Sequence, residues 1–158
     1  MKLVVVAVGQ RMPAWVEAGF AEYARRMPRE AAFKLIEIKA EPRADGDGRA
    51  IARLTEAEAK RIAAALPKGA FKVALDERGS NLTTRELADR FAAWKMEGRD
   101  IAFVIGGADG LSAAFKRDAD FVWSLSPLTL PHSLTRVVLA EQLYRAHSIL
   151  KNHPYHRA

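Results

Sequence analysis

Two short apolar runs, at residues 101–105 and 121–123, constrain the fold most strongly because each ends abruptly in a segment of different chemistry. The first run stops at a glycine-rich turn, residues 106–110 (GGADG). The second is followed by residues 124–132, a loop with almost no charge. Ligands of open α/β sheets bind beyond the carboxyl ends of the strands. The stretch therefore predicts two buried strands whose ends form a ligand site.

The rest of the chain alternates between apolar runs and amphipathic segments. Strands are expected at residues 2–8, 32–38, 71–75, 101–105 and 121–123. Helices are expected at residues 13–27, 49–66, 83–97, 111–117 and 133–150. This order predicts an α/β fold with a mainly parallel sheet flanked by helices, in a single domain spanning residues 1–158.

Local signals mark several of these elements. Thr83 and Glu86 form a capping box at a helix start, and Gly98 ends that helix. Two polar segments, residues 41–48 and 76–81, are expected to be loops, the first of them mobile. The inward side of the second helix is expected to carry Ile51, Leu54, Ile62 and Ala65.

The last helix, residues 133–150, has apolar residues on nearly every side at 100° per residue. A helix that is apolar all round is buried all round. A second copy of the chain, related by a two-fold axis, would supply the additional covering surface. The alternative is that the sheet and the first helix bury it alone.

Charge points to an anionic partner. The net charge is +6 with 158 residues, and all four histidines lie at or after position 132. From Arg136 onward, the sequence contains several basic residues but a single acidic one, Glu141. Nucleic acid is the usual partner of such a chain, although a merely soluble basic surface gives the same balance.

Composition also limits compartment and chemistry. There is no cysteine, which excludes disulfides and fits a reducing compartment. The apolar start is too short for a signal peptide and no run is long enough to span a membrane, so a cytoplasmic protein is expected.

Several common active-site motifs are absent. The glycine cluster lacks the Lys-Ser/Thr of a phosphate loop, and its spacing is not that of a dinucleotide fingerprint. No GxSxG elbow supports a hydrolase, and the histidines lack the spacing of a zinc motif, so no metal is expected. A tight strand-to-helix turn alone would explain the glycines. The uncharged loop, however, suits a flat heterocycle held by backbone groups.

The carboxyl-terminal residues combine cations, imidazoles and an aromatic ring, in the sequence KNHPYHRA. Arginine binds phosphates, tyrosine stacks on unpaired bases and histidine transfers protons near neutral pH. His153, Tyr155, His156 and Arg157 therefore suit RNA, whereas an unstructured basic tail is the plainer alternative.

Three long motifs carry a resemblance to a known family: VIGGADGLS, WSLSPLTLPHSLTRVVLAEQLYRAHSI and NHPYHR. Together with KLVVVAVGQRMPAWVEAGFAEYARR at the start, they resemble the ribosomal RNA large subunit methyltransferase H family, of the SPOUT class. Residues 43–55 fit least well. The resemblance implies a carboxyl-terminal trefoil knot, S-adenosylmethionine as cofactor, and a homodimer in which one subunit's tail completes the other's site. The implied reaction is methylation of N3 of a pseudouridine in the helix 69 hairpin loop of 23S rRNA, in the assembled ribosome.

The resemblance also implies site residues. Those that match the family's cofactor site are Leu75, Gly107, Ser126, Pro127, Leu128, Thr129, Leu130 and Pro131. The catalytic group implied is His153, Tyr155 and Arg157, and the RNA-binding group is His132, Arg145 and His156. No general base is assigned. Two alternatives stay open: a non-catalytic RNA-binding factor with the same fold, and a small-molecule α/β enzyme.

Overall fold

The computed structural model describes residues 1–42 and 47–156. Its strands are β1 (Leu3–Val8), β2 (Phe33–Ile38), β3 (Phe71–Asn81), β4 (Ile101–Ile105) and β5 (Phe121–Ser124). Its helices are α1 (Ala14–Arg26), α2 (Gly48–Ala65), α3 (Thr84–Glu97), α4 (Ala113–Asp118) and α5 (His132–Leu150), with short 3-10 turns at Arg29–Ala31 and Pro154–His156. The predicted alternation of strands and helices is confirmed.

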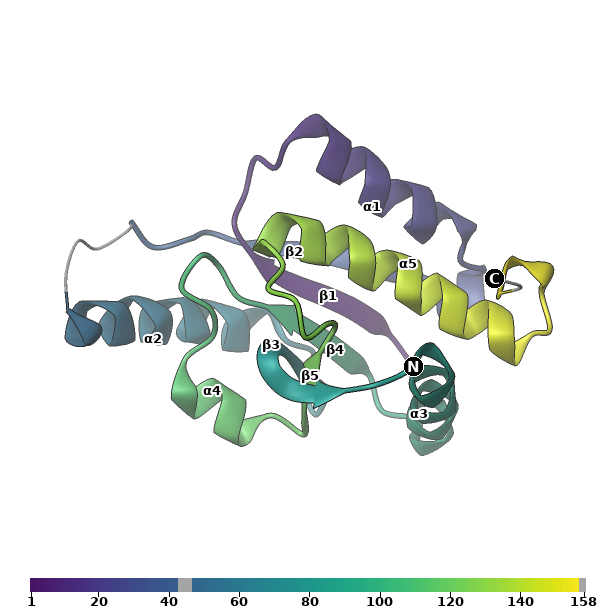
Figure 1. Ribbon diagram of the computed structural model, residues 1–158. Helices are drawn as coiled ribbons and strands as arrows, with labels where there is room; N and C mark the ends of the chain where they lie inside the picture. Colours follow the sequence, from purple (N-terminus) through teal and green to yellow (C-terminus); the bar gives the residue numbers. More distant parts are fainter. Residues whose placement is uncertain (43–46, 157–158) are drawn as a thin grey trace.

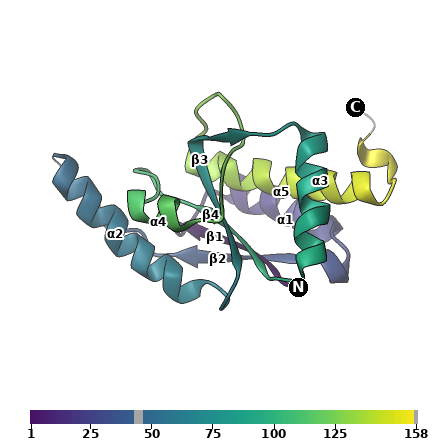
Figure 2. The same ribbon diagram turned by 90° about the horizontal axis from the view of Figure 1, so that it is seen from below.

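All five strands join one sheet in the order β2-β1-β4-β3-β5, and every pairing is parallel. Helices cover both faces, as Figures 1 and 2 show. Because both faces of β1 and β4 are covered, their side chains are buried along the whole strand, which explains their continuous apolar sequences. The predicted mainly parallel sheet is confirmed, whereas threading of the carboxyl end into a knot stays a prediction.

Alternate side chains of β1 belong to two separate cores. Leu3, Val5 and Ala7 pack with residues of α1, α3 and α5. Val4, Val6 and Val8 pack on the other face with residues of α2 and α4. The sheet is therefore the middle layer of three.

The capping box at α3 has the expected geometry. Thr83 Oγ1 accepts the Glu86 N–H at 3.1 Å, and a Glu86 carboxylate oxygen accepts the Thr83 N–H at 2.7 Å. The same helix ends at Gly98, whose φ of 71° lies in the left-handed region that glycine adopts without strain.

Two local predictions were wrong. Residues 76–81 are not a loop, because β3 runs on to Asn81 and pairs with β5 again after a register shift. Gly79 permits this close approach, since a Cβ there would lie 2.7 Å from the Val122 carbonyl oxygen. On α2, Ile51 is exposed rather than inward-facing, although Leu54 and Ile62 are buried. The predicted mobile loop at 41–48 lies partly outside the described residues.

Helix α5 packs against α1, α3 and the sheet, and runs antiparallel to β1 (Figure 1). Its start is therefore at the carboxyl edge of the sheet and its end at the amino edge. Arg136, counted above with the basic carboxyl end, is only 1% exposed and pairs with Glu37, so it adds nothing to a basic surface. None of the described helices is long and apolar enough to cross a membrane.

Candidate active site

A cavity of about 740 Å³ opens at the carboxyl ends of β3, β4 and β5. Its wall combines the ends of these strands with the glycine turn, the start of α5 and the segment between β5 and α5. We call this segment, residues 125–131, the pocket loop. The volume is typical of a site for one small organic molecule.

The glycine turn forms one side of the cavity. Gly107 and Gly110 make an isolated bridge, in which the Gly110 N–H donates to the Gly107 carbonyl at 3.0 Å. A Cβ on Gly106 would lie 2.5 Å from the Gly110 carbonyl carbon, which no side chain tolerates. The turn brings the backbone itself to the cavity wall, as a heterocycle held by backbone groups requires.

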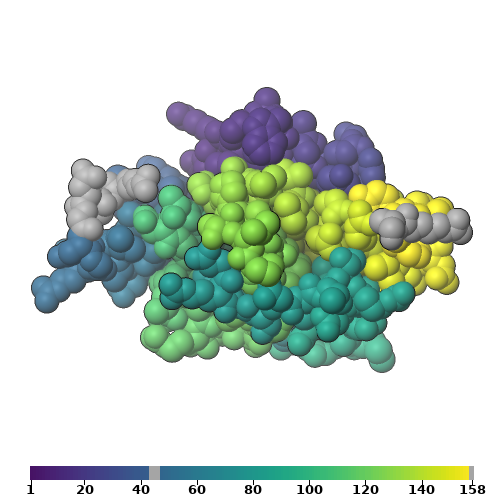
Figure 3. Space-filling view, viewed as in Figure 1, coloured from purple at the N-terminus to yellow at the C-terminus, as the bar shows by residue number. Residues whose placement is uncertain are grey.

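The pocket loop is held by its own short hydrogen bonds. The Ser124 hydroxyl donates to the Ser126 carbonyl at 2.8 Å, and the Ser126 hydroxyl accepts the Leu128 N–H at 2.9 Å. Thr129 donates its hydroxyl to Glu77 on β3 at 2.8 Å, which ties the loop to the opposite wall. Figure 3 shows this loop, in lime green, against the teal β3 segment.

Charge on the cavity wall is nearly balanced. Among the described residues that line it, Lys116 pairs with Asp76 at 3.6 Å, and Arg78 is the remaining cation beside the carboxylates of Glu77 and Asp109. A polyphosphate would need several unpaired cations or a phosphate loop. The wall therefore suits a ligand without clustered negative charge.

His132, the first residue of α5, closes the cavity near β1. Its Nε2 lies 4.0 Å from the position that a Cβ on Gly9 would take. One turn further along α5, the Arg136 guanidinium donates to the Gly9 carbonyl at 2.8 Å and to Glu37 at 2.7 Å. Burial, and secondly the Arg136 charge, hold the pKa of His132 below its usual range. Both effects favour the neutral form of the imidazole.

The tail, residues 151–156, packs at the other end of α5. The Tyr155 hydroxyl donates to Glu141 at 3.0 Å, and the Tyr155 ring lies 4.6 Å from that of Tyr144. Arg145 pairs with Glu141 at 2.6 Å and places its guanidinium 4.8 Å from the Tyr155 ring centroid. Burial and the Glu141 hydrogen bond raise the pKa of Tyr155 to about 12. The described part of the tail is therefore ordered, unlike the unstructured alternative.

The structure separates the predicted site residues into two groups. Those that line the cavity are Leu75, Gly107, Ser126, Leu128, Thr129, Leu130, Pro131 and His132. Pro127 belongs to the same loop but does not line the cavity. Arg145, His153, Tyr155 and His156 do not line it, and Tyr155 packs on Glu141 and Arg145, about 13 to 20 Å along the α5 axis from His132. Arg157 lies outside the described residues.

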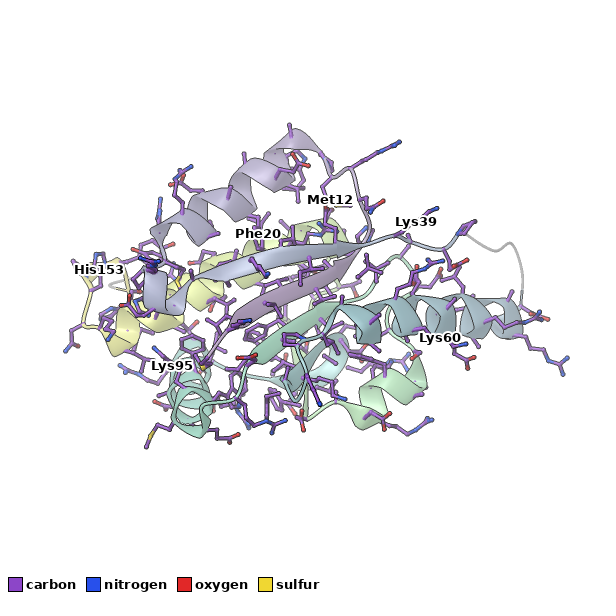
Figure 4. The ribbon with its side chains drawn as sticks, turned by 180° about the vertical axis from the view of Figure 1, so that it is seen from behind. Met12, Phe20, Lys39, Lys60, Lys95 and His153 are labelled. Atoms are coloured by element: carbon purple, nitrogen blue, oxygen red, sulfur yellow. The ribbon has the colours of Figure 1, made fainter. Side chains whose placement is uncertain are left out.

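Figures 3 and 4 show the same separation. In Figure 3 the yellow tail is at one side of the molecule and the pocket loop is near its centre. Figure 4 places His153 far from Met12, whose Cε would lie 3.1 Å from a Cβ on Gly9, near the His132 ring.

The sequence analysis missed several residues of the cavity wall, among them Glu77, Asp109, Lys116 and Thr135. The positions of two of them could have marked them as lining residues, because Glu77 follows the apolar part of a predicted strand and Asp109 lies in the glycine turn. No local pattern marks Lys116 and Thr135, which reach the cavity only through the packing of α4 and α5.

Two solved structures share the fold of this chain. A putative methylase family protein from Neisseria gonorrhoeae superposes with a TM-score of 0.54 at 16% identity, covering 90% of this chain and 81% of the other. A probable methylase family protein from Haemophilus influenzae superposes with a TM-score of 0.53 at 14% identity, covering 97% and 69%. A family model described as "Predicted SPOUT methyltransferase" matches residues 1–156. The fold and the cavity thus define the class, a SPOUT methyltransferase.

Relatives narrow this class further. The chain is 56% identical over 158 residues to the ribosomal RNA large subunit methyltransferase H of Bordetella petrii, covering all of both chains. It is 58% identical over 157 residues to the protein of that name from Ralstonia pickettii, covering 99% of both chains. The chain belongs to the ribosomal RNA large subunit methyltransferase H family.

Membership of this class makes S-adenosylmethionine the methyl donor. The cavity fits it, because its volume suits one small organic molecule and the pocket loop and glycine turn that line it carry few side-chain charges. The near-neutral wall also accepts a ligand that carries no phosphate.

Proposed function

We propose that this protein methylates N3 of a pseudouridine in the helix 69 hairpin loop of 23S rRNA, within the assembled ribosome. The observation that carries the proposal is the cavity between the glycine turn and the pocket loop, in a chain with full-length relatives of that family. The same family and substrate favour a single domain, residues 1–158, working in the cytoplasm, where ribosomes are found.

The proposed cofactor residues are those of the cavity wall, together with Pro127 of the pocket loop. S-adenosylmethionine supplies a methyl group already activated on a sulfonium. The protein's work is therefore mainly alignment, which confers a large rate advantage when the bound geometry is close to that of attack. The pocket loop would hold part of the cofactor, and the Thr129–Glu77 hydrogen bond fixes this loop to β3.

The proposed RNA and catalytic residues are His132, Arg145, His153, Tyr155, His156 and Arg157. Tyr155 cannot serve as a base, because its hydroxyl donates to Glu141 and its pKa is about 12. Its ring can stack or position the RNA base, and the Arg145 guanidinium can face phosphate or a developing negative charge.

Distance supports a homodimer as the working unit. In one chain the tail packs on Glu141 and Arg145, about 13 to 20 Å along α5 from His132, and no described tail residue lines the cavity. A two-fold axis that brings the tail of one subunit to the cavity of the other joins the two groups without changing either.

The test uses the purified protein, labelled S-adenosylmethionine, and ribosomes from a strain that lacks this gene. We expect label at one pseudouridine of the helix 69 loop in 23S rRNA. Binding of S-adenosylmethionine without transfer to ribosomes would move the substrate to another RNA. RNA binding without any binding of S-adenosylmethionine would instead identify a non-catalytic factor with the same fold.

A further inference from the structure

Methylation at N3 requires a proton acceptor, and the following inference rests on the proposed function. The N3 atom of the base carries a hydrogen, so its lone pair becomes available only when this proton leaves. A general base contributes most when its own pKa lies near the working pH. The ionisable proton acceptors among the described residues of the cavity wall are three carboxylates and the His132 imidazole.

Most acceptors of the cavity wall are carboxylates that already have partners. Asp76 pairs with Lys116, and Glu77 accepts the Thr129 hydroxyl. A carboxylate also has a pKa far below neutral, which makes it a weak base for an imide N–H. Asp109 remains, on the partly exposed glycine turn.

The imidazole of His132 differs from these carboxylates in position and support. It directly follows the pocket loop, is half-buried, and lines the same cavity. Gly9 leaves room beside its Nε2, and Arg136 fixes that backbone through the Gly9 carbonyl. His132 thus lies in the first turn of α5, one turn before the buried Arg136 and not on a surface loop.

Electrostatics keeps this imidazole in its basic form. Burial and the neighbouring Arg136 hold the pKa of His132 below its usual range. Glu37 on β2 binds Arg136 and so offsets part of that charge. The other charged groups that face the cavity are Asp76, Glu77 and Arg78 on β3, Asp109 in the glycine turn and Lys116 on α4.

We propose that His132 is the general base of the methyl transfer. His132 takes the N3 proton on its free ring nitrogen, and the N3 lone pair forms the new bond to the methyl carbon. The carbon–sulfur bond breaks as that bond forms, and its electron pair stays on sulfur. The products are the N3-methylated base, the neutral thioether and a His132 imidazolium, which returns its proton to water.

The experiment compares wild-type protein with His132→Gln, His132→Asn and Ser133→Ala. Ser133 is the neighbouring residue but does not line the cavity, so Ser133→Ala is the matched control. Single-turnover methylation of ribosomes should fall about 10²- to 10⁴-fold in both His132 variants and stay unchanged in the control. The affinities for S-adenosylmethionine and for ribosomes, measured by calorimetry and filter binding, should change less than about twofold, well under the 1.4 kcal/mol of a tenfold loss.

Two further readouts use the pH dependence. The wild-type rate should fall as pH drops through the His132 pKa, at a lower pH than for an ordinary imidazole, and both His132 variants should lose this inflection. In the NMR spectrum of the wild-type protein, the His132 ring protons should titrate below the usual histidine range. This signal is assigned by its absence from the variants, and it remains informative if a variant folds poorly.

The outcomes separate the two proposals. Methylation within about threefold of wild type in His132→Gln would overturn the assignment. So would a rate loss that follows a matching loss of S-adenosylmethionine affinity, or a His132 that is protonated at neutral pH. A wild-type protein that binds no S-adenosylmethionine would overturn the proposed function itself, before any variant is considered.

Discussion

The two ends of α5 differ in kind, although one rigid helix carries both. At its start, the pocket loop and His132 border an open cavity of about 740 Å³. Along its second half, Glu141 binds both Arg145 and the Tyr155 hydroxyl of the tail. The first end is prepared to receive a ligand, whereas the second presents a preassembled group of rings and cations. This difference is what the proposed homodimer would explain, with the cavity of one subunit completed by the tail of the other.

The two arginines of α5 differ in the same way, and the difference affects how much each stabilises the fold. Arg136, near the start, is fully buried and binds Glu37 and two backbone carbonyls. Arg145, nearer the end, is partly exposed and binds Glu141 within the same helix. Removal of a buried charge partner costs far more than removal of an exposed one.

Arg136→Met should lower the stability of the fold more than the other substitutions. We expect about 3 kcal/mol less free energy of unfolding, because the variant leaves buried carbonyl groups and Glu37 without their partner. Arg145→Met, the same substitution at the other end, should cost about 1 kcal/mol. Urea unfolding followed by circular dichroism measures both, and equal losses would remove the energetic contrast between the two ends.

A smaller effect is expected for Tyr155→Phe. It deletes the hydroxyl that donates to Glu141 but keeps the ring against Tyr144, so tail docking should weaken by about 1 kcal/mol. The measurement is hydrogen exchange at the His153 amide, which donates to the Ser148 carbonyl at 2.8 Å. Tyr155→Ala, which removes the ring as well as the hydroxyl, is the comparison variant and should weaken tail docking further. Unchanged exchange in Tyr155→Phe would show that ring packing alone holds the tail.

The sequence predicts the open end of α5 well because its signals are local. Apolar runs that stop at glycines or at an uncharged loop mark strand ends, and strand ends of a parallel sheet lie at one edge. The capping box at Thr83 and the left-handed Gly98 are local in the same way. These features need no knowledge of distant partners.

Long-range pairing explains what the sequence could not predict. Arg136 looks like a surface cation until Glu37, 99 residues earlier, is found beside it. Residues 76–81 are polar as a loop would be, yet pairing with β5 makes them a strand. The tail docks because Tyr144 and Glu141 both contact Tyr155. Composition does not show that these two residues lie together.

The central claim is that a cavity and a tail from different chains form one site, and coexpression of two defective chains tests it most directly. One chain carries Thr135→Trp, which fills the cavity, and the other lacks residues 151–158. Each purified alone should be inactive, while the truncated chain still binds S-adenosylmethionine. The heterodimer, purified through two tags, contains one intact cavity beside one intact tail, so it should methylate at about half the wild-type rate per dimer. A heterodimer as inactive as its parents, or a truncated chain that methylates alone, would contradict the account.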